Sequence, residues 1–201
     1  MKNLIACLAF NPNNDGAILP IMESRLKDII SLCRDNPKAK LVLMGGPTFR
    51  DTSTGNQSLE MKEYIEKSAA DILANTETVL TNEGTSTVRE LCILREMIEQ
   101  EGGETRLTIV ASEFFVDRVK LYAEYIFGNL RNIDFVASEV PAEGREGFQR
   151  IEEIKLQKGH EWLDGREKGD YKKILGEQEA FEQKVIRGEI DHPISRAIKP
   201  R

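Results

Sequence analysis

Short continuous apolar runs alternate along the chain with longer segments in which apolar residues recur every three or four positions. Runs of about four to eight apolar residues are typical of strands buried on both faces, and the longer spacing is typical of helices. The runs lie at residues 3–10, 40–44, 77–80, 106–111 and 132–137. Strands that alternate with helices predict right-handed crossovers and a parallel sheet covered by helices on both faces.

Each helical segment between these runs carries one apolar stripe. The first segment ends before Asn36-Pro37, because proline cannot continue a helix. The stripes consist of Ile18, Met22, Leu26, Ile29 and Cys33; of Leu59, Met61, Tyr64 and Ile65; of Val88, Leu91, Cys92 and Ile98, with Arg95 on the same, mostly apolar face; and of Phe115, Val119, Tyr122 and Ile126. We therefore expect a three-layer, Rossmann-like α/β domain over residues 1–147.

The last quarter of the chain has a different composition. From residue 150 it is nearly half charged, with basic and acidic residues mixed. Apolar residues nevertheless keep helical spacing, and Trp162 and these stripes need burial. The positions are Phe148, Ile151, Ile154, Tyr171, Leu175, Phe181 and Val185. The pattern predicts a charged helical extension over residues 148–201 that packs on the sheet domain or on a partner, which leaves a homo-oligomer open.

The charge of the chain excludes one class of partner. A net charge of −6 and a pI near 5.2 argue against a nucleic-acid binder, which needs a basic face for the phosphates. The apolar run at residues 4–10 is too short for a signal sequence or for a bilayer span of roughly 20 residues. We expect no membrane insertion and a cytoplasmic location.

The three cysteines, Cys7, Cys33 and Cys92, lie in separate apolar segments and form neither a CxxC pair nor a cluster with histidine. We expect three reduced thiols in the core and no metal site. The two histidines, His160 and His192, belong to the charged extension. We expect them to be solvated rather than catalytic.

In an open parallel sheet, ligands bind beyond the carboxyl ends of the strands, where loops and helix N-termini converge. Four loops should gather there: residues 10–17, the polar segment after Gly45-Gly46, residues 82–87, and the segment that begins at Ser112. The glycine pair either lets backbone approach a ligand or makes a tight turn. We expect the functional pocket at this end of the sheet.

The segment Thr85-Ser86-Thr87 opens a predicted helix. Thr87 and Glu90 fit a capping box, in which the threonine oxygen accepts from a backbone N–H group and the glutamate reaches back. Free N–H groups and several hydroxyls at a helix start also favour an anion. The two roles can coexist.

Two arginines are candidates for holding an anion. Arg118 lies one turn into its helix on the core-facing side, and a guanidinium there can fork onto a carboxylate or phosphate. The alternative is a surface pair with Glu113 or Asp117. Arg25 lies in the middle of its helix, beside Leu26, and has the same two interpretations.

The order of these motifs resembles the SanA/ElyC/YdcF-like family of bacterial Rossmann-like proteins, over about residues 3–137. Its marks are Arg25-Leu26, Gly45-Gly46 after the second strand, Met61 to Ile65, Ser86-Thr87 at a helix start, and Ser112 leading to Arg118. The resemblance implies a site for a small anionic or nucleotide-like ligand. One member of the family is associated with S-adenosylmethionine, which makes this molecule one candidate cofactor. The sequence indicates no other.

The chain departs from the family at several motif positions. These are Gln57 and Thr81, each in place of a Glu; Arg89-Glu90 in place of Glu-Asn; and Phe115 in place of a His. Losing the histidine removes the most natural proton-transfer group. The resemblance leaves Glu83 and Glu60, each displaced from its family position, as the acid/base candidates.

The leading hypothesis is a cytoplasmic enzyme or binding protein for a small phosphate- or nucleotide-bearing molecule; as an enzyme it would be a transferase or hydrolase. Arg118 and Arg25 would hold the anion, and further donors would come from Gly45, Gly46, Thr85, Ser86, Thr87 and Ser112. A second hypothesis is a non-catalytic binding or regulatory module that docks a protein partner through its C-terminal helices. An S-adenosylmethionine-binding protein is the third.

Overall fold

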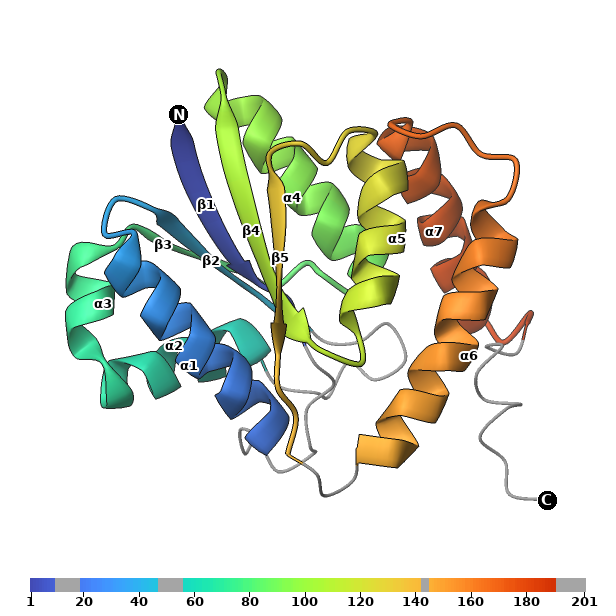
Figure 1. Ribbon diagram of the computed structural model, residues 1–201. Coiled ribbons are helices and arrows are strands. Elements are labelled where there is room, and N and C mark those ends of the chain that lie inside the picture. The colour runs from blue at the N-terminus through green and yellow to red at the C-terminus, as the bar shows by residue number, and fades with distance from the viewer. Residues whose placement is uncertain (10–18, 47–55, 142–144, 191–201) are drawn as a thin grey trace.

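The computed structural model describes residues 1–9, 19–46, 56–141 and 145–190. Five parallel strands form one sheet in the order β3-β2-β1-β4-β5 (Figure 1). The strands are β1 (Lys2–Cys7), β2 (Lys40–Met44), β3 (Thr78–Thr81), β4 (Thr105–Ser112) and β5 (Ile133–Ser138). The Rossmann-like α/β fold expected from the alternating pattern is confirmed.

The central strand β1 shows why continuous apolar runs become strands here. Successive side chains of a strand point to opposite faces of the sheet, so a strand covered on both faces must be apolar at every position. Leu4 and Ala6 belong to the core on one face, and Ile5 and Cys7 to the core on the other. Their fractional exposure does not exceed 2%.

Helices cover both faces of the sheet (Figure 1). On one face lie α1 (Pro20–Asp35), α2 (Gln57–Ser68) and α3 (Ala70–Asn75), and on the other lie α4 (Thr87–Glu101) and α5 (Val116–Phe127). The short helix α3 was not predicted. Ala69, with φ −159°, separates it from α2, and its buried Ile72 extends the apolar surface of the preceding helix.

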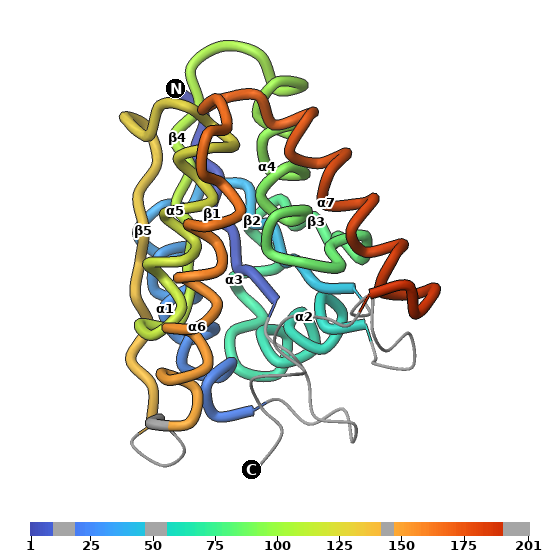
Figure 2. Tube along the Cα trace, turned by 90° about the vertical axis from the view of Figure 1, so that its right-hand side faces the viewer, coloured from blue at the N-terminus to red at the C-terminus, as the bar shows by residue number. Residues whose placement is uncertain are grey.

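The C-terminal extension forms two helices, α6 (Arg145–Leu163) and α7 (Tyr171–Ile186), on the outer side of α4 and α5. Figures 1 and 2 agree that α6 runs beside α5, and Figure 2 shows α7 against α4. Leu163, Tyr171 and Ile174 are buried in the same apolar core as the sheet residues. Trp162 packs edge-on against Tyr122 of α5, with ring centroids 6.2 Å apart. The helices predicted from residue 148 onward are therefore packed on this chain.

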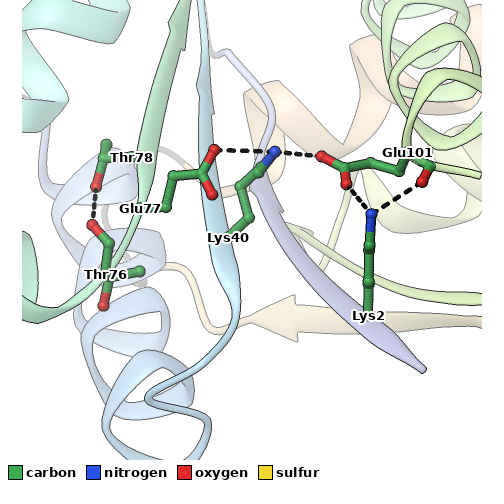
Figure 3. A network of polar contacts seen from close by, with 6 residues as sticks. All are labelled: Lys2, Lys40, Thr76, Glu77, Thr78 and Glu101. Atoms are coloured by element: carbon green, nitrogen blue, oxygen red, sulfur yellow. Dashed lines mark hydrogen bonds and ion pairs between the residues drawn. The ribbon is translucent and has the colours of Figure 1, made fainter.

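Charged side chains pair with one another at the amino ends of β1 and β2 (Figure 3). Glu101, at the end of α4, accepts from Lys2 of β1 and from Lys40 of β2, and Lys40 also pairs with Glu77. The two lysines lower the pKa of Glu101 to about 2. This network joins β1 and β2 to the end of α4.

All three cysteines are buried and unpaired, and His160 is exposed, as predicted; His192 lies outside the described residues. Among the helices of the described ranges, none has the length and apolar character needed to cross a bilayer.

Candidate functional site

The sheet has its topological switch point between β1 and β4. The chain leaves β1 for β2 on one side of the sheet, whereas β4 leads to β5 on the other side. Loops that follow such a strand pair diverge, which makes room for a ligand. We call the end of the sheet where Cys7, Met44, Thr81, Ser112 and Ser138 end their strands the carboxyl edge.

Arg25 reaches the carboxyl edge from α1. Its side chain is fully buried, its Nε donates to Ser112 Oγ at 2.8 Å, and its Nη1 donates to the carbonyl oxygen of Leu8 at 3.0 Å. Burial lowers the pKa of Arg25 to about 10, so the guanidinium still carries its charge at neutral pH. The arginine predicted from its place in the helix therefore points to the switch point and bridges the ends of β1 and β4.

Arg118 reaches the same place from the first turn of α5. Its Nε donates to Glu152 Oε2 at 2.7 Å, and its Nη1 donates to Thr87 Oγ1 at 3.2 Å. Glu152 raises the pKa of Arg118 against the opposing effect of burial. The surface pair with Glu113 or Asp117, the alternative interpretation, is wrong: the partner is a buried carboxylate of the C-terminal extension.

One aromatic ring connects the two arginines. The Cζ atom of Arg118 lies 4.5 Å from the ring centroid of Phe115, and the Cζ atom of Arg25 lies 5.4 Å from the same centroid. Guanidinium groups this close to a ring are attracted by its negative face. Phe115, which stands where the resembled family has a histidine, thus provides a surface for two cations and offers no group for proton transfer.

Glu90 is the acid of the site that the sequence interpretation missed. Its side chain is only 2% exposed, and its Oε1 accepts from the backbone N–H of Ala9, just beyond β1, at 3.0 Å. Burial raises the pKa of Glu90 to about 7, although the Ala9 N–H group, Arg25 and Arg118 favour the ionised form. A carboxyl group that titrates near neutral pH can take up and release a proton during a reaction.

The predicted capping box of Thr87 and Glu90 is wrong. Ser86, not Thr87, caps α4, and its Oγ accepts from the backbone N–H of Arg89. Glu90 turns away from the helix start and toward β1. The sequence contained a usable signal, because the apolar Leu94 follows Glu90 by four residues and therefore lies on the same helix face. Leu94 is fully buried, so this face points inward.

Thr85 and Thr87 both bind groups of the protein itself. Thr87 Oγ1 accepts from Arg118, and Thr85 Oγ1 donates to Glu182 Oε2 at 2.9 Å. Glu182 comes from α7 and, like Glu152 of α6, is buried. Sequence reasoning could not find these two carboxylates, because nothing in a charged helix indicates which of its residues will face a distant loop.

The glycines of the site serve close packing between loops. A Cβ atom on Gly46 would lie 2.0 Å from the carbonyl oxygen of Asn82, and one on Gly45 would lie 2.6 Å from Gln57 Cβ. The backbone N–H of Gly45 donates to the carbonyl oxygen of Thr81. Both glycines are therefore explained by close approach of other backbone, of α2 to Gly45 and of the segment after β3 to Gly46, and neither has the positive φ that a glycine turn requires.

The two acid/base candidates taken from the family, Glu83 and Glu60, are not bonded to either arginine in the part of the chain that the structure describes. Glu83 is exposed, and Glu60 is half-buried on α2, where burial and Glu63 raise its pKa. Within the described ranges, neither makes a hydrogen bond or ion pair with Arg25 or Arg118. The loop at residues 10–17 and residues 48–55 of the polar loop lie outside the described part of the chain.

We define the buried charge cluster as Arg25, Glu90, Arg118 and Glu152. The pKa of Glu152 is lowered: burial opposes ionisation, but Arg118 and Lys155 more than offset it. The two guanidiniums face one ionised carboxylate, Glu152, and the raised pKa of Glu90 shifts the balance of the cluster toward positive charge. Such a site attracts an anion.

The chemistry of the cluster also bears on the possible cofactors. S-adenosylmethionine carries a sulfonium and an ammonium beside its carboxylate, so it complements a positive cluster less well than a phosphate does. For metals, the described ranges contain no group of three or more side chains suited to hold an ion.

Comparison of the chain with protein-family models, with curated proteins and with solved structures gives no match in any of the three.

Proposed function

We propose that the carboxyl edge binds a small phosphate- or nucleotide-bearing molecule and that Arg118 and Arg25 hold its anionic group. The observation that carries the proposal is the convergence of two guanidiniums on one phenylalanine ring at the switch point: Arg25 is fully buried, and the Arg118 side chain is 12% exposed. Arginine is rarely buried unless an anion or several acceptors bind it. Its planar fork matches phosphate oxygens, and a water-poor site strengthens that attraction.

Glu90 supports a catalytic role for the same site. Its carboxyl group interacts electrostatically with both arginines and titrates near neutral pH, which suits a proton donor or acceptor in phosphoryl transfer or hydrolysis. We propose Glu90 in this role in place of Glu83 and Glu60. A Glu90→Gln variant that binds the ligand but has lost turnover would identify the protein as an enzyme.

The packing of the extension weighs against the partner-docking alternative. The apolar residues of α6 and α7 that such docking would use, including Leu163 and Tyr171, are buried against α4 and α5. Docking would need a different face of these helices. We keep a cytoplasmic location as part of the proposal, consistent with three unpaired thiols.

The test is a thermal-shift and calorimetric screen with inorganic phosphate, AMP, a prenyl phosphate and S-adenosylmethionine. A ligand that binds only the folded protein stabilises it by roughly 2.7 kcal/mol at a hundredfold excess over Kd. Arg118→Ala alone would leave Glu152 buried without its main partner, which costs about 3–5 kcal/mol. The informative variant is therefore Arg118→Gln combined with Glu152→Gln, which removes both charges together.

We expect the phosphate compounds to stabilise the native chain and this double variant to lose the effect. The matched control is Arg106→Gln with Asp134→Asn, which neutralises an exposed ion pair near the amino ends of β4 and β5. It should bind as the native chain does. Equal affinity in the native chain and the Arg118/Glu152 variant would refute the proposed site.

A further inference from the structure

Glu152 occupies the groups that the proposed ligand would use. It lies on α6, outside the sheet domain, yet the residue is only 6% exposed and its carboxylate reaches Arg118 Nε. Its second oxygen accepts from Lys155 Nζ at 2.6 Å. A carboxylate held between a guanidinium and an ammonium has the surroundings of a bound anion, supplied by the chain itself.

Glu182 repeats this arrangement from the other helix of the extension. Its Oε2 accepts from Thr85 Oγ1 and its Oε1 from Gln178 Nε2, and the residue is 4% exposed. Thr85 and Thr87 flank Ser86, the cap of α4. Two helices far along the chain thus each bring one buried carboxylate to the start of α4.

These two buried contacts, an ion pair and a hydrogen bond, differ from the exposed ion pairs that attach the extension. Lys168 and Glu124 join the segment before α7 to α5 with about half of each side chain exposed, and Arg89 pairs with the similarly exposed Glu179. The helices already adhere through apolar residues such as Leu163 and Tyr171. Burying a carboxylate costs more free energy than leaving an ion pair at the surface, so packing alone does not account for Glu152.

We propose that Glu152 is an intramolecular competitor for the anion site, so that a ligand binds by displacing its carboxylate from Arg118. This inference rests on the proposed function. Exchange favours ligands with more charge and more acceptor oxygens than a carboxylate has. A phosphate monoester carries a charge of about −1.5 to −2 and three terminal oxygens, so it outcompetes a monoanionic carboxylate such as acetate.

The experiment measures calorimetric affinities of the full chain for inorganic phosphate, AMP and acetate. Glu152→Gln removes the competing charge and keeps an oxygen that can accept from Arg118. We expect this variant to bind phosphate and AMP roughly ten- to hundredfold tighter than the native chain, the usual range for coupling between neighbouring groups. We also expect measurable acetate binding in the variant alone. Thermal unfolding confirms that it is folded.

The matched control is Glu124→Gln, which removes an exposed carboxylate of α5 that pairs with Lys168. Its affinities should equal those of the native chain. If the native chain binds phosphate and Glu152→Gln binds it no tighter, the competitor is refuted and the anion site stands. If neither binds any of the anions, the proposed function fails and the competitor fails with it. Should Glu152→Gln fail to fold, Glu152→Ala with Lys155→Ala is measured against the same expectation.

Discussion

At the scale of single residues, the carboxyl group of Glu90 is held where folding opposes its charge. Three groups favour its ionised form, the Ala9 N–H group, Arg25 and Arg118, and burial outweighs all three. Functional sites often contain groups whose pKa is displaced in this way, at some cost in stability. The same displacement gives Glu90 a measurable signature that does not require knowledge of the ligand.

The pKa of Glu90 rises from 4.5 to about 7 on folding. Between these values the folded protein binds a proton that the unfolded chain does not, so this contribution is complete below pH 4.5 and is lost as pH rises through 7. Glu90→Gln stays neutral and can still accept from Ala9. We expect the variant to be more stable than the native chain at pH 8, by on the order of 3 kcal/mol, and equally stable near pH 4.5.

Urea unfolding of both proteins from pH 4.5 to pH 8 gives the comparison. Only the difference between the two curves matters, because other carboxyls contribute the opposite slope: the pKa values of Glu101 and Glu152 are lowered by their basic neighbours. Parallel curves would show that Glu90 ionises normally in the folded protein.

At the scale of elements, periodicity predicted all five strands and every helix except α3. The strand at residues 40–44 is reproduced to the residue, because a buried strand and a turn such as Gly45-Gly46 are encoded locally. The site was only partly predictable. Arg25 and Arg118 could be placed from their helix faces, whereas Glu152 and Glu182 depend on how distant helices dock. Glu90 was misassigned because Thr-x-x-Glu describes a capping box equally well.

The loops that follow β2 and β3 come into close contact at Gly46, where a side chain would not fit. A Cβ atom at position 46 would overlap the backbone of Asn82, so Gly46→Ala forces apart the segments that follow β2 and β3. We expect a loss of about 2–3 kcal/mol in the free energy of unfolding. Gly176→Ala is the matched control: its Cβ meets nothing within 4 Å in the interior of α7, so the variant should gain about 0.5–1 kcal/mol.

Chemical denaturation of the two variants and the native chain measures both effects. The prediction for position 46 is wrong if its alanine variant unfolds at the native denaturant concentration. A destabilised Gly176→Ala would instead show that α7 tolerates less change than its exposed position indicates.

At the scale of the whole molecule, the C-terminal extension forms part of the apolar core. Leu163, Tyr171 and Ile174 share one apolar cluster with Val88 and Leu91 of α4. A shortened chain that ends at residue 141 would expose the outer faces of α4 and α5, and would leave Arg118 without Glu152. We therefore expect it to lose cooperative thermal unfolding and to bind a hydrophobic dye.

Calorimetry and dye fluorescence test this on the shortened and full-length chains. A full-length chain carrying Lys168→Ala is the control and should unfold as the native chain does, because it loses an exposed ion pair with Glu124 and a cation–π contact with Tyr125 but keeps the apolar core of the extension. A shortened chain that unfolds in one sharp transition would show that the first 141 residues fold independently.

The order of strands in the sheet also governs how the chain can fold while it is being synthesised. The central strand β1 is made first, and its Leu4 pairs with Leu107 of β4, about a hundred residues later. At about 5–20 residues per second, the ribosome takes roughly 5–20 s to deliver that partner. Throughout this interval one edge of an almost wholly apolar strand is open to chaperones and to other nascent chains, so slowing translation before β4 should lower the yield of native protein.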